Sequence, residues 1–380
     1  MTLPDAVVVG AGPAGSVAAL VLARAGATVR LIDRSSFPRA KLCGDTINPG
    51  TLAILDRLGI GTDVRGPARP ITGMLVTGPG GTSIAADYPC GLRGMALERS
   101  RFDALVLNAA VAAGVDFLPN VDAVVPLLHA ESRVAGIRVR HQSRESELRA
   151  RIVIAAEGRS SRLAAALGLT RFAPSPKRWA FGAYYTDVSG LTTRGEMHIR
   201  PDGYIGVAPL GGSLVNTCVV RQRQNIPAGE RADMTLARAL DADVPLRQRF
   251  AGARRVSPVV SLGPLAVDAE AAGCSGLLLA GDTAGFVDPM TGDGLRFAVR
   301  GGELAAIAAL CELATGAPGH EQLRAARGHE FSGKWRLNRA LRSLVASPLC
   351  VRLAAGVASC WSAPIQALIG IAGDVHLARP

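Results

Sequence analysis

The sequence has few aromatic residues, no closely paired cysteines and no histidine clusters, and each shortage excludes a class of protein. Tryptophan, tyrosine and phenylalanine make up 4% of its 380 residues, too few for the stacking platforms that bind single-stranded nucleic acid. The seven cysteines are an odd number, lie far apart and form no C-x-x-C pair, which argues against a disulfide framework or a zinc site. The histidines show no H-E-x-x-H spacing, so we expect no metal.

Blocks of like charge are also missing. The net charge of +11 comes almost entirely from arginines spread along the chain, whereas a nucleic-acid binder usually concentrates its basic residues. We therefore expect no nucleic-acid partner. The first apolar strand pattern begins within a few residues of Met1, which leaves no room for a signal peptide and predicts a cytoplasmic protein with reduced thiols. Nothing in the sequence indicates the oligomeric state.

Apolar residues are abundant, at 48%, and the chain opens with an ordered strand-turn-helix-strand unit. A buried strand leads into a G-x-G-x-x-G turn at Gly10, Gly12 and Gly15, a helix follows, and a second strand ends at Asp33. Gly10 permits the tight turn, Gly12 lets the backbone approach a pyrophosphate, and Gly15 lets the helix pack closely on the strand. The unit predicts a dinucleotide on the helix N-terminus, with Asp33 accepting hydrogen bonds from a ribose.

Two later apolar runs end in the same manner as the second strand. One is followed by Glu157-Gly158 and the other by Gly281-Asp282. In a doubly wound sheet the carboxyl ends of parallel strands share one edge, and ligands bind there. The sequence therefore predicts that Asp33, Glu157 and Asp282 meet at one ligand-binding edge.

The intervening segments predict a second domain, so the fold class is α/β. A hairpin pattern lies near residues 74–85, and four turn-separated strands fill 172–221. Locally, we expect Thr51 to cap a helix, a polar turn over 141–147 and helical structure over 234–250. The first predicted part is a Rossmann-like domain with a doubly wound parallel sheet, over residues 1–70, 95–170 and 272–330. The second is a mainly antiparallel β-sheet substrate domain over residues 71–94 and 171–271. C-terminal helices over residues 331–380 are the third.

The stretch 341–373 is rich in alanine, leucine and valine. Pro348, Arg352, Pro364 and Gln366 interrupt it, which argues against a single membrane-spanning helix. We expect two short amphipathic helices packed on the body of the protein. A peripheral contact with a membrane surface is the alternative.

Together these motifs resemble the flavoprotein family with the para-hydroxybenzoate hydroxylase fold. The opening glycines, R-x-x-F-D from Arg99, and the two acid-glycine loops occur in the order of that family over nearly the whole chain. The stretches F-P-R-x-K-x-C-G-D over 37–45 and G-D-x-A-G-F-V-D-P-x-T-G-D-G over 281–294 resemble its geranylgeranyl reductase-like branch. That branch also includes hydroxylating and halogenating relatives.

The resemblance implies FAD as the cofactor. Arg99 would reach the phosphates on the flavin side, Asp282 would bond the ribityl chain or the pyrophosphate, and Cys43 and Gly44 would line the ring. The helix that begins at Leu295 would direct its N-terminus at the pyrimidine edge, which favours the anionic reduced flavin. The predicted cofactor-binding residues are Gly10, Gly12, Pro13, Ala14, Gly15, Asp33, Arg34, Lys41, Cys43, Gly44, Arg99, Glu157, Gly158, Gly281, Asp282, Pro289, Gly292, Gly294 and Leu295.

The reaction type depends on the substrate sheet. Geranylgeranyl reductases resemble Y-x-W-x-F-P there, and this chain keeps Tyr204 and Pro209 but has Gly206 and Ala208 in place of the two large walls. We therefore favour a monooxygenase that uses NAD(P)H and oxygen to hydroxylate an apolar or phenolic small molecule in a dry pocket.

The alternative is a reductase that saturates a C=C bond of an isoprenoid or lipid. A halogenase, which would need W-x-W-x-I-P and a catalytic lysine, and a non-catalytic FAD-binding protein are less favoured. Cys43 and Tyr204 are the candidate catalytic residues. Tyr184 and His198 are further polar residues in the substrate sheet.

Overall fold

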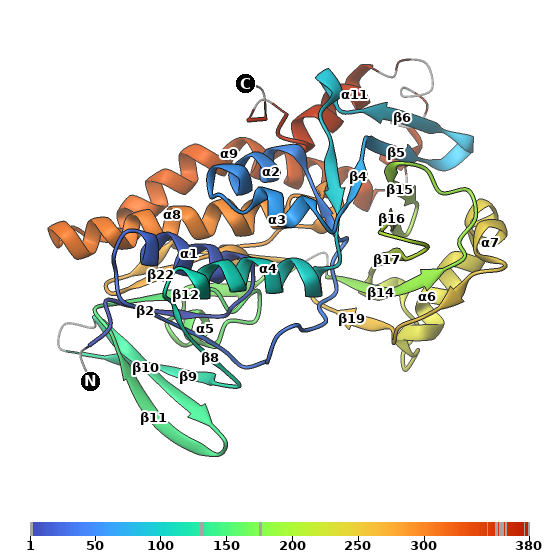
Figure 1. Ribbon diagram of the computed structural model, residues 1–380. Helices are drawn as coiled ribbons and strands as arrows, with labels where there is room; N and C mark the ends of the chain where they lie inside the picture. The colour runs from blue at the N-terminus through green and yellow to red at the C-terminus, as the bar shows by residue number, and fades with distance from the viewer. Residues whose placement is uncertain are drawn as a thin grey trace.

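The fold is built on a six-stranded sheet of buried apolar strands. Figure 1 shows the computed structural model, which describes residues 3–129, 133–174, 177–347, 349–353, 356, 361, 363–375 and 377–378. The sheet has the order β21-β22-β12-β1-β2-β8, and every pair is parallel except β21 with β22. Its strands are β1 (Ala6–Val9), β2 (Val29–Asp33), β8 (Asp116–Pro119), β12 (Ile152–Ala155), β21 (Gly273–Cys274) and β22 (Leu277–Leu279). This parallel sheet confirms the predicted Rossmann-like fold.

Layers on both faces explain why the central strands are apolar throughout. One face packs against α1 (Pro13–Arg24), α4 (Arg99–Ala112) and α8 (Gly294–Thr315), which lie together above the sheet in Figure 1. The other face packs against α5 (Arg162–Ala166) and a three-stranded sheet of β9 (Asp122–Leu128), β10 (Val134–His141) and β11 (Arg144–Arg149).

A second, mainly antiparallel sheet lies beside the first, at the right of Figure 1. Its order is β18-β14-β17-β16-β15-β5-β6, with β19 also paired to β14, and only β15 with β5 is parallel. These strands are β5 (Gly73–Thr77), β6 (Ser83–Asp87), β14 (Arg178–Thr186), β15 (Arg194–Arg200), β16 (Gly203–Pro209), β17 (Val215–Gln222), β18 (Arg254–Arg255) and β19 (Val260–Leu262). Helices α6 (Ala232–Asp241) and α7 (Val244–Phe250) cover one face.

The remaining elements link the two sheets. Helix α9 (Gly319–Ala346) lies along α8, and α11 (Ala363–Ala372) packs on β6. No helix in the described part of the chain is both long enough and apolar enough to cross a membrane. The smaller elements are α2 (Pro49–Arg57), α3 (Gly61–Arg65), a sheet of β3 (Thr46–Ile47), β7 (Gly94–Ala96) and β4 (Arg69–Ile71), and the pair β13 (Thr170–Phe172) and β20 (Val267–Ala269).

Of three local expectations, the cap is wrong, and the turn and the helical segment are correct only in part. Helix α2 is capped by Asn48, whose Oδ1 accepts from the Thr51 amide at 2.8 Å, because Pro49 is well suited to the first helical position. The polar segment 141–147 is mostly strand: β10 and β11 form an exposed hairpin, and its two turn residues have positive φ. Residues 234–250 form two helices, because Asp243 caps α7 through the Leu246 amide at 3.1 Å.

The C-terminal stretch agrees only partly with the expectation of two short helices. Helix α9 is a long helix that continues to Ala346, and α11 is short. Pro348 lies outside the described residues. Strands of the second sheet come from both segments predicted for the substrate domain, but the domain limits themselves stay a prediction.

Candidate cofactor and substrate site

One cavity of about 830 Å³ runs from the edge of the parallel sheet to the second sheet and the C-terminal helices. Its wall includes every residue predicted from the sequence to bind the cofactor except Gly15. Tyr204 also lines it, whereas Tyr184 and His198 do not. The sequence pattern therefore located residues that the fold brings together, and their individual roles toward a cofactor stay predictions.

The glycine turn at the start of α1 forms one end of the cavity, and its glycines differ in what they make possible. A Cβ at Gly15 would lie 1.8 Å from the Gly10 carbonyl oxygen, and one at Gly10, where φ is +99°, would lie 2.4 Å from the Ala156 oxygen. A Cβ at Gly12 would meet nothing closer than the Arg39 guanidinium at 3.5 Å. Gly10 and Gly15 are thus required by the packing, and Gly12 leaves the helix N-terminus open to the cavity.

Asp33 holds this turn in shape, a role that the sequence pattern did not reveal. Its Oδ2 accepts from the Ala11 amide at 2.8 Å, and its Oδ1 accepts from the Ser35 amide at 2.9 Å. The carboxylate lines the cavity and so remains placed to accept from a ribose as well.

Positive charge gathers beside the α1 N-terminus. Arg99 bonds Asp103 through Nε at 2.8 Å and Nη2 at 3.1 Å, and Arg39 lies 3.6 Å from the same carboxylate. Lys41 has no hydrogen bond or ion pair to any described residue, although its amine lies near Gly158 in the cavity wall. Burial, followed by the nearby Arg99, lowers the pKa of Lys41, and Asp282 opposes this.

These features fit an FAD pyrophosphate. Lys41, which bonds no other described residue, and the N-terminus of α1 both line one cavity, and each favours an anion. Asp282 likewise has no hydrogen bond to another described side chain, which leaves its carboxylate available to hydroxyl groups. Lys41, Gly12 and Asp282 would hold the phosphates and the ribityl chain, and the bound flavin would supply hydride chemistry.

The Glu157-Gly158 loop is tied to the protein itself. Glu157 accepts from the hydroxyl of Ser161, the N-cap of α5, and, at 3.1 Å, from the Arg162 amide in the first turn of that helix. Burial raises the pKa of Glu157. Gly158 exchanges hydrogen bonds with the Thr283 hydroxyl at 2.9 and 3.0 Å, which fixes this loop against the Gly281-Asp282 loop.

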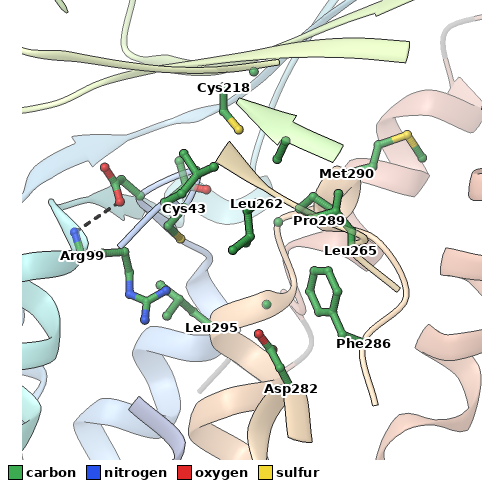
Figure 2. Close-up of a pocket in the computed structure, with 18 of the residues that line it drawn as sticks. Cys43, Arg99, Cys218, Leu262, Leu265, Asp282, Phe286, Pro289, Met290 and Leu295 are labelled. Carbon is green, nitrogen blue, oxygen red and sulfur yellow. Dashed lines mark hydrogen bonds between the residues drawn. The ribbon is translucent and has the colours of Figure 1, made fainter. Parts of the chain in front are cut away.

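The N-terminus of α8 lines the same end of the cavity as the glycine turn, which we call the cofactor end. Gly292, with φ +70°, turns the chain into the helix, and Leu295 is buried beneath the cavity (Figure 2). Asp293, which follows Gly292, accepts a hydrogen bond from Lys334 of α9, and Lys334 also lies 2.7 Å from Asp374 Oδ2. These C-terminal partners of the loop have no local sequence signal.

Cys43 faces the cavity from the loop that follows β2. Figure 2 shows it beside Arg99, with Cys218 on the sheet above and Phe286 and Met290 across the space. The Asn216 side chain donates to the Cys43 carbonyl at 2.9 Å and so fixes the loop against β17. Burial raises the pKa of the Cys43 thiol, and the Arg99 guanidinium opposes this.

The Tyr204 hydroxyl is directed at a buried ion pair. It donates to Asp288 Oδ1 at 2.5 Å, and Arg178 donates to Asp288 Oδ2 at 2.8 Å. Burial, followed by the Asp288 charge, raises the pKa of Tyr204. The contact connects the second sheet to the loop before α8, and a catalytic role for Tyr204 stays a prediction.

His198 lies in a separate network. One ring nitrogen is 2.9 Å from Glu196 and the other is 2.9 Å from the Thr77 hydroxyl. Arg249 pairs with both Glu196 oxygens, at 2.7 and 2.9 Å. Glu196 reaches the cavity wall, whereas the histidine does not.

Comparisons with known proteins agree with this site. A family model described as an FAD binding domain matches residues 4–327. A digeranylgeranylglycerophospholipid reductase of Methanoculleus marisnigri is 28% identical over 343 residues, covering 88% of this chain and 82% of the relative. A menaquinone reductase of Mycobacterium tuberculosis is 32% identical over 317 residues, covering 80% and 75%.

Among solved structures, a geranylgeranyl bacteriochlorophyll reductase-like protein from Thermoplasma acidophilum matches with a TM-score of 0.81 and 24% identity, covering 92% of this chain and 90% of that one. A flavin-dependent brominase matches with a TM-score of 0.85 and 20% identity, covering 98% and 94%. At these identities the likeness shows a shared fold.

The fold and the site define an FAD-dependent oxidoreductase. The chain belongs to the FAD-binding-domain family and, within it, to the geranylgeranyl reductase-like branch that the sequence motifs indicated.

The expected monooxygenase reaction is wrong. Relatives that match over most of their length are named reductases, including several digeranylgeranylglycerophospholipid reductases. The expectation rested on Gly206 and Ala208, but a Cβ at Gly206 would find no atom closer than 3.8 Å. Small residues there widen the cavity without changing what a flavin can do, so two wall positions are a poor guide to reaction type.

Proposed function

We propose that this protein is an FAD-dependent reductase that saturates C=C bonds in the prenyl chain of a lipid. The observation that carries the proposal is the continuity of the cavity, which extends from the cofactor end into a chamber with apolar walls. Its lining residues come from the second sheet, the loop before α8 and the C-terminal helices. Figure 2 shows Leu262, Leu265, Phe286 and Met290 among them, and the C-terminal helices add Leu344 and Val351.

The residues of this chain would perform three tasks. Apolar side chains of the chamber bind the hydrocarbon and exclude water, because each buried CH₂ group contributes about 0.8 kcal/mol. The room beside Gly206, where an added Cβ would make only ordinary contacts at 3.8 and 3.9 Å, accepts a branched prenyl unit. The loop that carries Cys43, fixed by Asn216, presents the thiol to the reacting end of the chain.

The names of the relatives suggest two lipid classes. Several are named for a prenylated glycerophospholipid and one for menaquinone, a quinone that carries a prenyl chain. Both substrates contain isolated trisubstituted double bonds, so the same chamber suits either. For the electron donor we keep NADH or NADPH as part of the proposal.

The decisive experiment mixes anaerobically reduced, FAD-loaded protein with a geranylgeranylated phospholipid or with menaquinone. We expect flavin reoxidation at a rate that depends on substrate. The extracted lipid should gain two hydrogens for each reduced C=C bond, and menaquinone should keep this gain after its quinone ring has been reoxidised in air. NADH and NADPH are compared as reductants in the first step. Flavin reoxidation only on admission of oxygen, with oxygen inserted into the lipid, would contradict the proposal.

We also propose a peripheral contact with a membrane surface through the C-terminal segments. Large apolar side chains are exposed there: Leu349 by 65%, Leu353 by 63% and Trp361 by 63%. The same region supplies lining residues of the apolar chamber, so a lipid chain could enter directly from a bilayer.

Tryptophan fluorescence tests this contact. Vesicles containing anionic lipid are expected to shift the Trp361 emission to the blue, and a Trp361→Ser variant should lose most of the shift. Trp179, which is only partly exposed on β14, serves as the matched control in Trp179→Phe. An equal shift in the wild type and in Trp361→Ser would contradict a contact at this segment.

A further inference from the structure

A buried carboxyl group lies in the cavity wall beside Cys43. Asp45 has no exposed surface, yet it belongs to the cavity lining. Its Oδ2 accepts from the Tyr184 hydroxyl at 2.7 Å and from the Asn216 amide at 2.6 Å, and its Oδ1 accepts from the Arg99 amide at 3.2 Å. Neither the sequence motifs nor the comparisons assign a role to this residue.

We propose that Asp45 supplies the proton that accompanies hydride addition to the double bond, and that Tyr184 replenishes it from solvent. The inference rests on the proposed reductase function and names the acid for it. Asp45 is one of the cavity-lining residues, whereas Tyr184 is not one of them and is only half-buried. A hydrogen bond of 2.7 Å joins the Tyr184 hydroxyl to Asp45 Oδ2, so the partly exposed residue is connected directly to the lining residue.

The electrostatic surroundings suit an acid that works near neutral pH. Burial raises the pKa of Asp45 to about 7, and the hydrogen bonds from Tyr184 and Asn216 and the charge of Arg99 hold it below what burial alone would give. The other titratable groups that face it are the thiols of Cys43, on its own loop, and Cys218, on β17. Glu98 lies near Tyr184. A carboxyl group with a pKa near the working pH is protonated often enough to donate and easily reprotonated.

One carbon of the double bond takes the Asp45 proton with the π electron pair, and the other carbon takes the hydride delivered from the reduced cofactor. The cofactor is oxidised by two electrons and the lipid is reduced by two. The Asp45 carboxylate then takes the hydroxyl proton of Tyr184 while that oxygen receives a proton from water.

Single-turnover kinetics with the prenyl lipid test the proposal as a function of pH. In the wild type, the rate of flavin reoxidation by substrate should fall as the pH rises through about 7, because the donating form of Asp45 is lost. Asp45→Asn should slow this step by about 100-fold or more, and its rate should no longer fall as the pH rises through about 7. Tyr184→Phe deletes a hydrogen bond that lowers the pKa of Asp45, so the fall of the rate with pH should occur at higher pH in this variant.

A measurement without turnover accompanies the kinetics. Infrared spectra of the FAD-loaded protein should show a neutral carboxyl band that disappears above about pH 7, is missing in Asp45→Asn and titrates at higher pH in Tyr184→Phe. Tyr185→Phe is the matched control, because Tyr185 is the next residue on β14 and packs against Phe250 at the opposite face. This variant should leave both the pH dependence of the rate and the infrared band of Asp45 unchanged.

The outcomes separate the two proposals. The role of Asp45 would be overturned if the rate of Tyr184→Phe fell over the same pH range as that of the wild type. It would also be overturned if Asp45→Asn were slower but kept the wild-type pH dependence. The reductase function would stand in both cases. A wild type that reduces no prenyl lipid, with the infrared titration intact, would overturn the reductase function and with it the acid's task.

Discussion

Gly15→Ala is expected to destabilise the parallel-sheet domain by at least about 3 kcal/mol, although alanine is the better helix former. The added Cβ would lie 1.8 Å from the Gly10 carbonyl oxygen and 3.2 Å from the Ala156 side chain. Both neighbours belong to the sheet edge, where backbone cannot yield as a flexible side chain would. Helix propensity alone would favour alanine by about 1 kcal/mol, so a loss of stability shows that close packing dominates.

Urea unfolding of the FAD-free protein measures this effect, and Gly12→Ala in the same turn is the control. Its Cβ would find no atom within 3.5 Å, and its backbone already has a φ of −71°. We expect its unfolding midpoint to stay close to the wild-type value. Equal stability of the two variants would contradict the packing role given to Gly15.

The second large effect is expected from Asp288→Ala, which should lower the free energy of unfolding by about 3–5 kcal/mol. Asp288 pairs with Arg178, and their side chains are 2% and 3% exposed. Removing the carboxylate leaves the guanidinium buried without its counter-charge and also frees the Tyr204 hydroxyl and the Met290 amide. Because these contacts join the second sheet to the loop before α8, weaker FAD retention should accompany the loss.

Asp87→Ala is the control for this prediction. It breaks the Asp87–Arg194 pair at 2.9 Å, in which the carboxylate is 52% exposed, so the cost should stay within about 1 kcal/mol. Replacing both members of the buried pair, in Arg178→Met with Asp288→Leu, should recover much of the stability, because no uncompensated charge remains. A cost for Asp288→Ala no larger than for Asp87→Ala would contradict the argument.

Sequence patterns located the cofactor end of the cavity because its parts are local. Asp33 ends β2, and Glu157 and Asp282 lie within three residues of the ends of β12 and β22, so the shared direction of these parallel strands brings the three acids to one edge. The reaction type was misjudged because it was predicted from small residues in the cavity wall, and the size of the wall at Gly206 says little about the chemistry.

The groups that sequence reasoning missed are those whose partners are distant in the chain. Asp45 is an unremarkable acid after a glycine until β14 and β17 place Tyr184 and Asn216 against it, more than a hundred residues away. Lys334 reaches Asp293 in the same long-range way.

The amino-acid sequence by itself determined the parallel sheet, the glycine turn and the membership in a flavoprotein family, because each of these depends on short motifs of neighbouring residues that can be recognised one at a time along the chain. The tertiary structure alone decided which polar groups are buried together, which of them face the cavity and how far the apolar chamber extends. Burial and charge pairing are properties of surfaces that meet only after folding, and they set the protonation of groups such as Asp45.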